Sequence, residues 1–144
     1  MKLIRIEQNC VEVTWPYVKH FIKKPLDRGM NERGIDDIYL SLLHNQMQLW
    51  VLASEEEEGM LGACITQLIQ YPKYKALSLP LVGTKPHTIS KWYEYTMDDN
   101  SPLMQWGKEQ GAVRLECYVR DGWLKYTKKF NFKKYYTTIV KEIE

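Results

Sequence analysis

The chain has 144 residues, of which 44% are hydrophobic and 26% charged, and its formal net charge at pH 7 is +2. This composition is typical of one globular domain, and the charge is too small to indicate nucleic acid or a membrane surface as a partner. Three cysteines without a Cys-x-x-Cys pair and three scattered histidines match no metal-site spacing. We therefore expect a single domain over residues 1–144 that holds no metal.

The N-terminus and the lengths of the apolar runs indicate in which cellular compartment the protein is expected. The N-terminus has no pattern of a secretory signal, and no apolar run approaches the ~20 residues that a bilayer-spanning helix needs. We expect a reducing, cytoplasm-like compartment and no membrane partner.

The first half of the chain predicts strands and two helices. Alternating apolar residues predict a strand over residues 2–7. Thr14 is expected to cap a helix that stops near Pro25, because the residue before a proline avoids helical dihedrals. A second helix follows, with Asp36 and Asp37 favourably placed near its positive end. Apolar runs then predict strands over residues 49–53, 60–71 and 76–82.

The third of these strands contains a proline. Pro80 cannot donate to a strand ladder, so one neighbouring strand must be missing there or must part from it. A turn around Gly83 then leads into a helix that opens at Ile89. Such a join directs backbone N–H groups and the positive end of a helix dipole at one spot, which suits a phosphate group. Many strand–loop–helix joins have this shape and bind nothing.

The remaining elements complete the predicted order. Ser101 and Pro102 are expected to restart the helix, which stops at Gly111. A strand over residues 112–119, a short basic helix over residues 123–130 and a last strand over residues 135–143 follow. The order β-α-α-β-β-β-α-β-α-β predicts an α/β (α+β) fold, a single mixed sheet with helices on both faces.

This element order, the glycine loop before a helix and the segment over residues 111–133, with its Arg120-Asp121-Gly122 and Phe130-Asn131-Phe132, resemble the GNAT superfamily of N-acetyltransferases. More narrowly, the chain is similar to a divergent branch encoded by tailed bacteriophages, some members of which are structural or internal virion proteins. The resemblance covers nearly the whole chain. It implies a fold in which the pantetheine of acetyl-CoA inserts between two splayed parallel strands.

The resemblance also implies the residues that contact the cofactor. By position, Leu79 and Leu81 would flank the pantetheine, and Arg120 falls where an asparagine often contacts the cofactor. The pyrophosphate would be held by backbone amides of Gly83, Thr84, Lys85, Thr88 and Ile89. The loop departs from the family pattern, because it has one glycine and because Pro86 lacks an N–H.

Acetyl transfer to an amine needs a base for the amine and an acid for the leaving thiolate. Glu116 and His87 are the candidate bases; the alternatives are an exposed ladder position for Glu116 and a plain loop position for His87. The tyrosine that serves the family as acid falls on Thr127. Tyr126, one place earlier, is the candidate acid here, or it packs between a helix and the sheet.

Two functions follow. The first is an acyl-CoA-dependent N-acyltransferase on an amine, and the alternative is a catalytically degenerate phage protein of the same fold that serves as a virion or interaction component. Only one strand is expected after the last helix, whereas the family has two. The acceptor side of the substrate cleft would then be open or completed by another copy of the chain. Expected partners are therefore virion or other proteins or a second copy, in a host cytoplasm or a virion. A nucleic-acid binder that uses the lysines over residues 125–134 is the third reading, and the low net charge argues against it.

Overall fold

The computed structural model describes residues 1–29, 32–55 and 59–143. Within this part of the chain, strands form one sheet with the order β1-β2-β3-β4-β5. Their bounds are Lys2–Ile6 for β1, Gln48–Ala53 for β2, Met60–Gln70 for β3, Lys75–Thr84 for β4 and Ala112–Cys117 for β5. Neighbours from β1 to β4 are antiparallel, whereas β4 and β5 are parallel. The mixed sheet confirms the predicted α/β class.

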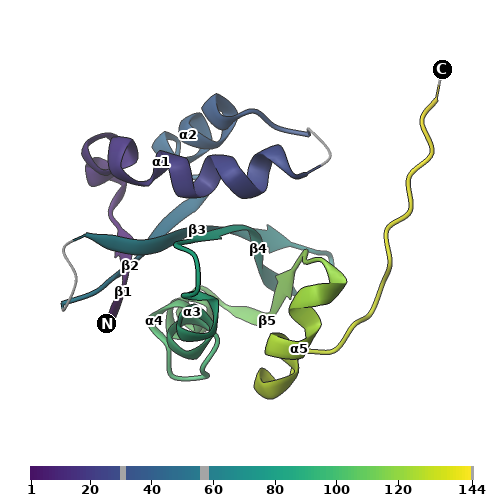
Figure 1. Cartoon of the computed structure of the whole chain (residues 1–144). Coiled ribbons are helices and arrows are strands. Elements are labelled where there is room, and N and C mark those ends of the chain that lie inside the picture. The colour runs from purple at the N-terminus through teal and green to yellow at the C-terminus, as the bar shows by residue number, and fades with distance from the viewer. Residues whose placement is uncertain (30–31, 56–58, 144) are drawn as a thin grey trace.

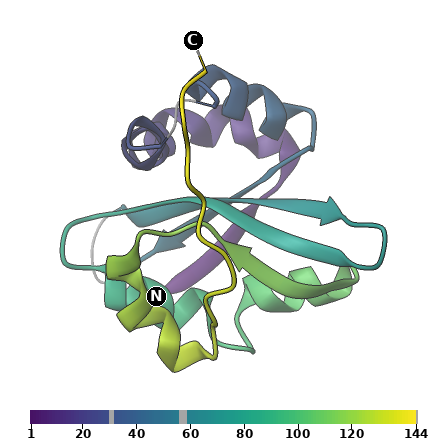
Figure 2. The same cartoon turned by 90° about the vertical axis from the view of Figure 1, so that its right-hand side faces the viewer.

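Helices cover both faces of this sheet, as predicted (Figures 1 and 2). One face carries α1 (Val11–Asp27) and α2 (Ile35–Leu43). The other carries α3 (Ile89–Thr96), α4 (Pro102–Glu109) and the short α5 (Leu124–Thr127). A separate apolar core lies under each group of helices. None of the described helices is long and apolar enough to cross a membrane.

Helix α1 is longer at both ends than the sequence predicts. It begins at Val11, so Thr14 is not its N-cap, and it continues through Pro25 to Asp27. The first turn forms because Val11 is buried and extends the apolar face by one turn. Pro25 is tolerated because it stands in the last turn, where only the carbonyl of Phe21 loses its helical donor.

The predicted starts of α2, α3 and α4 are confirmed, whereas the helix predicted over residues 123–130 is α-helical only over Leu124–Thr127. The Gly34 N–H donates to Oδ2 of Asp37 at 2.7 Å, which closes the first turn of α2. Ser101 caps α4, since its Oγ accepts a hydrogen bond of 3.1 Å from the Met104 N–H. Both local patterns are complete within four residues, so the sequence alone identifies them.

The predicted last strand is wrong. Residues 135–143 are extended but pair with no described strand, and Figure 1 shows them as a yellow segment that leaves the body after α5. The turn that precedes them fixes this exit. Asn131 has a left-handed φ of 66°, and the Phe132 N–H donates to the Thr127 carbonyl at 3.4 Å, a helix-ending motif. A strand also needs an edge to pair with, and a residue pattern cannot show where that edge lies.

Candidate functional site

The two parallel strands part in the middle of β4. Their last paired residues are Leu79 and Cys117, whereas β4 itself continues to Thr84. Pro80 is the first residue beyond the last pair, and β5 ends at Cys117, so the neighbouring strand predicted to be missing or to part at the proline is missing there in the described part of the chain. Among the residues that the structure describes, the parted half of β4, residues 80–84, has a neighbouring strand on one side only, and this is β3.

A β-bulge lies at the point of parting. In the β3–β4 ladder, Ile65 is opposite Leu81 but Gln67 is opposite Ser78. Two residues of β4, Leu79 and Pro80, therefore stand opposite Thr66 alone. A bulge bends its strand and increases the local twist, which turns the parted half of β4 away from β5.

The register shows which backbone groups face the gap between the strands. The Lys85 N–H donates to the Leu61 carbonyl at 2.8 Å, which continues the β3–β4 ladder beyond its last paired strand residue. Hydrogen-bonded and non-hydrogen-bonded pairs alternate in an antiparallel ladder. The backbone groups of Val82 and Thr84 consequently point away from β3, toward the side where β5 has ended.

Gly83 has a structural use that its sequence position does not reveal. A Cβ added there would lie 1.8 Å from the backbone oxygen of Phe21. In a regular helix this oxygen would accept a hydrogen bond from the residue four positions later, but that residue is Pro25, which has no N–H. The Cα hydrogen of Gly83 faces it, the geometry of a weak Cα–H···O contact. The glycine thus lets α1 approach β4 closely, whatever else the loop does.

The loop after β4 forms one tight turn before α3. The Thr88 N–H and its hydroxyl both donate to the Lys85 carbonyl, at 3.3 and 2.6 Å. Pro86 stands second in this turn and His87 third, with a φ of 66°. Pro86 therefore fills the position where a turn favours proline. Three of the five amides predicted to face a pyrophosphate are turned inward: those of Lys85 and Thr88 are bonded inside the protein, and ladder parity directs that of Gly83 toward β3.

The first turn of α3 offers backbone N–H groups that are not bonded within the helix. In any α-helix the first N–H groups have no partner within the helix, and this applies to Ile89 and the two residues that follow it. A hollow of about 180 Å³ adjoins the loop and has Lys24 and Lys85 among its lining residues. Two cationic side chains beside the loop suit an anion, although no residue of α3 lines this hollow.

Glu116 is not a plain exposed ladder position. It lies one residue before the last paired residue of β5, and its Oε2 accepts a hydrogen bond of 2.8 Å from the Tyr71 hydroxyl. This hydrogen bond is the main reason why the pKa of Tyr71 is raised to about 12. The guanidinium of Arg114, two residues earlier, lies 4.2 Å from the ring centroid of Tyr74. The carboxylate therefore belongs to a polar cluster at the start of the gap.

Tyr126 lies on the other face, in an aromatic cluster. It is half-buried and stacks on Tyr93, with ring centroids 5.8 Å apart. Burial raises the pKa of Tyr93, and the nearness of Cys117 and Tyr126 adds to this shift. Tyr126 and Cys117 thus both lie next to Tyr93. Thr127 is buried, and its hydroxyl donates to the Leu124 carbonyl at 3.1 Å, so it has no free proton to offer.

Cys117 itself is not a nucleophile in this state. Burial, followed by the nearness of Glu116, raises the pKa of its thiol to about 12. At neutral pH the group is a thiol, and only a thiolate is strongly nucleophilic. The side chain belongs to the core that packs against α3.

The remaining predicted cofactor and base residues lie in different surroundings. Leu79 belongs to the core under α3 and α4, and Leu81 to the core under α1 and α2, because the bulge reverses the alternation of side chains. Arg120 is exposed, and its carbonyl accepts from the Trp123 N–H at 2.9 Å. His87 is exposed on the loop, on a different element from Glu116.

Two features of the site were missed in the sequence. The Tyr71 hydroxyl reaches Glu116 across 45 positions of the chain, so no local pattern indicates the contact. The direction of the Val82 and Thr84 amides, toward the gap, depends on which β3–β4 pairs are hydrogen-bonded, and the bulge shifts that alternation. A larger hollow of about 450 Å³ lies elsewhere, between α4 and β5.

The sequence matches no protein-family model and no curated protein. Its structure is similar to that of a predicted acetyltransferase with acetyl-CoA from Clostridium acetobutylicum, with a TM-score of 0.68 and 12% identity over 98% of this chain and 95% of that one. An aminoglycoside acetyltransferase from an uncultured soil metagenomic sample, in complex with sisomicin, gives a TM-score of 0.67 and 12% identity over 99% and 96%. A ribosomal-protein-alanine N-acetyltransferase from Brucella melitensis biovar Abortus 2308 gives 0.63 and 9% over 99% and 100%. At these identities the likeness shows the fold alone, and it is the GNAT acetyltransferase fold.

Proposed function

We propose that this protein is an acyl-CoA-dependent N-acyltransferase that uses acetyl-CoA and acts on an amine. The observation that carries the proposal is the parting of β4 and β5 beyond Leu79 and Cys117, with the backbone groups of Val82 and Thr84 facing the gap. Unpaired backbone groups along one strand side are what an amide-bearing arm needs in order to bind as an extra strand. Pantetheine is such an arm.

The residues around the gap fit a CoA thioester. The backbone of Val82 and Thr84 would hold the two amides of the pantetheine, and the N-terminus of α3 at Ile89 would hold the pyrophosphate. Lys85 and Lys24 add positive charge beside the same loop. Arg120 stays a cofactor-binding candidate, whereas Gly83 and Thr88 could approach the cofactor only without offering their amides, which are turned inside the protein. When bound, the cofactor supplies an activated acyl group.

Glu116 is proposed to accept the proton of the acceptor amine. Its carboxylate lies beside the last paired residues, and the Tyr71 hydroxyl fixes one of its oxygens at 2.8 Å. The other oxygen is left to take a proton from an ammonium group. Tyr126 is proposed to supply a proton through its Oη from the opposite face of the sheet. Because Cys117 is a thiol, the amine would attack directly and no cysteine would carry the acyl group.

A second candidate function is a non-catalytic protein of this fold that serves as a virion or interaction component, as the phage-branch resemblance implies. Thr127 favours it, since the position that carries the tyrosine acid in the family holds a buried, bonded hydroxyl. The two candidates differ in one property. Only the first requires the gap to accept pantetheine.

The experiment compares two substitutions of one gap residue. Val82→Pro removes the N–H that faces the gap, whereas Val82→Ala keeps it and shortens the side chain. Calorimetric titration with acetyl-CoA should give one site per chain for the wild type and for Val82→Ala. Val82→Pro should bind at least roughly tenfold more weakly, the effect of one lost hydrogen bond. A flat wild-type titration at high acetyl-CoA concentration would leave the non-catalytic function.

Turnover tests the chemistry separately from binding. Free thiol released from acetyl-CoA in the presence of a panel of primary amines should appear with the wild type. Glu116→Gln should bind acetyl-CoA as the wild type does and lose about 10²–10⁴-fold in turnover, the usual contribution of a general base. Unchanged turnover in Glu116→Gln would remove this residue from the mechanism.

A further inference from the structure

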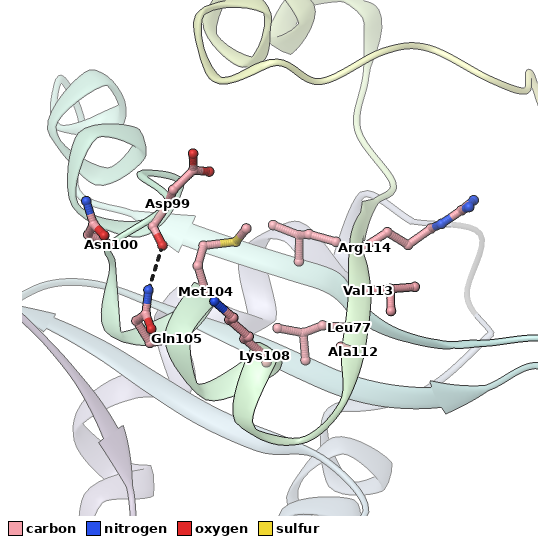
Figure 3. Close-up of a pocket in the computed structure, with 11 residues that line it drawn as sticks. Leu77, Asp99, Asn100, Met104, Gln105, Lys108, Ala112, Val113 and Arg114 are labelled. Carbon is pink, nitrogen blue, oxygen red and sulfur yellow. Dashed lines mark hydrogen bonds between the residues drawn. The ribbon is translucent and has the colours of Figure 1, made fainter.

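One edge of the sheet is exposed next to a hollow that is lined by both apolar and polar side chains. β5 is the last strand of the sheet in the described part of the chain, so its outer row of backbone groups has no neighbouring strand there. Val113 on this strand is 70% exposed. The adjoining hollow of about 450 Å³ between β5 and α4 is lined by apolar residues such as Leu77 and Met104 and by charged residues such as Asp99 and Lys108 (Figure 3). Such an edge is a template for one more strand.

A segment with the composition of a strand is exposed in the same chain. Residues 135–143, here called the C-terminal segment, are mostly aromatic or β-branched: Tyr135, Tyr136, Thr137, Thr138, Ile139, Val140 and Ile143. Tyr136 and Ile139 are each 91% exposed, and Ile143 is 97% exposed. At roughly 3.3 Å per residue the segment spans about 30 Å when extended. This is enough to cover the six residues of β5.

The C-terminal segment is directed away from the edge of its own chain. The left-handed Asn131 and the hydrogen bond from Phe132 to Thr127 close the last helical turn. Just beyond, the Nζ of Lys134 lies 3.6 Å from Oδ1 of Asp121. Figure 1 shows that the segment then runs out from the body instead of back along β5. Pairing within one chain would require this turn to be undone.

We propose that two copies of the chain exchange their C-terminal segments, each of which adds a strand to the β5 edge of the other copy. A second copy is the occupant because one two-fold exchange covers both edges and both segments at once. A strand from another protein would cover an edge and leave the C-terminal segment exposed. Apolar side chains of the segment, Ile139 among them, would enter the hollow beside α4. The exchange does not depend on acyl-CoA binding.

Sedimentation of the full chain over a concentration series tests the exchange. The wild type should give twice the mass of one chain. Ile139→Lys, which replaces an apolar side chain of the segment by a charged one, should give the mass of one chain and keep a single cooperative melting transition. Val13→Lys replaces an apolar residue on α1 that is 73% exposed, and this control should remain a dimer. A monomeric wild type, or a dimer that survives Ile139→Lys, would overturn the proposal.

Cross-linking shows which edge each segment covers. One chain carries Val113→Cys and a second carries Thr138→Cys, both with Cys10→Ser because Cys10 is exposed. After the two are mixed, a short bis-maleimide should join one chain to the other, and peptide mapping should place the link between positions 113 and 138. A link inside a single chain that carries both substitutions would mean that the segment closes on its own sheet, and the exchange would be wrong.

Discussion

The two halves of β4 belong to one continuous strand but have different neighbouring strands in the fold. The paired half, ending at Leu79, lies between β3 and β5, so its backbone groups are bonded on both sides. The parted half, residues 80–84, is bonded to β3 alone. A single proline at a bulge separates them. One strand can therefore be rigid core at one end and a binding edge at the other, and the effects below should differ between the halves.

Amide hydrogen exchange should show the largest difference. The Tyr71 N–H donates to the Tyr74 carbonyl, so these two residues form a hydrogen-bonded pair of the β3–β4 ladder. Because hydrogen-bonded and non-hydrogen-bonded pairs alternate along the ladder, the Leu77 amide points away from β3 and toward β5. Leu77 should exchange orders of magnitude more slowly than Val82, whose amide faces the gap. The measurement is residue-resolved exchange of the free protein. Equal protection of the two amides would mean that the strands are zipped.

Gly83→Ala should break the parted half without any ligand. Its Cβ would lie 1.8 Å from the Phe21 oxygen, so α1 would have to shift, and overpacking of this kind costs about 1–3 kcal/mol or more in the free energy of unfolding. Gly122→Ala is the control, because no atom lies within 4 Å of a Cβ there. Urea unfolding of both variants checks the difference. Matching midpoints would show that α1 does not need the glycine. Loss of acetyl-CoA binding in Gly83→Ala alone would not identify a cofactor contact.

Truncation of side chains should sharpen the comparison further. Leu77 in the paired half is 2% exposed, and Leu77→Ala should lower the free energy of unfolding by about 2–5 kcal/mol. Val82 is only half-buried, so Val82→Ala should cost about 1 kcal/mol. Denaturant melts of the two variants give both values. A larger loss for Val82→Ala would indicate that the parted half is also packed core.

The smallest expected effect is a pH dependence at the start of the gap. The hydrogen bond to Glu116 raises the pKa of Tyr71 from its ordinary 10.0 to about 12, so the folded state keeps a proton that the unfolded state has lost. The contribution of this group to stability is complete below pH 10 and is lost as the pH rises to about 12. Tyr71→Phe should flatten the fall of the melting temperature over that interval. An identical alkaline profile would show that the hydroxyl is not held by the carboxylate.

Most of the fold could be predicted from local sequence patterns. The alternation of apolar residues, the cap at Ser101 and the proline at position 80 each depend on a few adjacent residues, and the structure confirms them. The start of α1 was missed because Thr14 mimics a cap, whereas the burial of Val11 depends on packing. The last strand was wrong because pairing depends on a distant edge.

The site was less accessible to sequence reasoning than the fold. The parting of the strands follows from Pro80, but the contact of Tyr71 with Glu116 joins two distant segments. The true neighbour of Gly83 is a carbonyl of α1, freed by a proline 58 positions earlier in the chain. Cofactor roles for the gap residues stay predictions until a ligand is added.

Amide chemical shifts followed during titration with acetyl-CoA test the central claim most directly. If pantetheine lies between the parted strands, the amides of Val82, Thr84 and Ile89 should shift together and saturate, while that of Leu77 stays fixed. Shifts confined to the hollow between α4 and β5, or no shifts at high acetyl-CoA concentration, would contradict the claim.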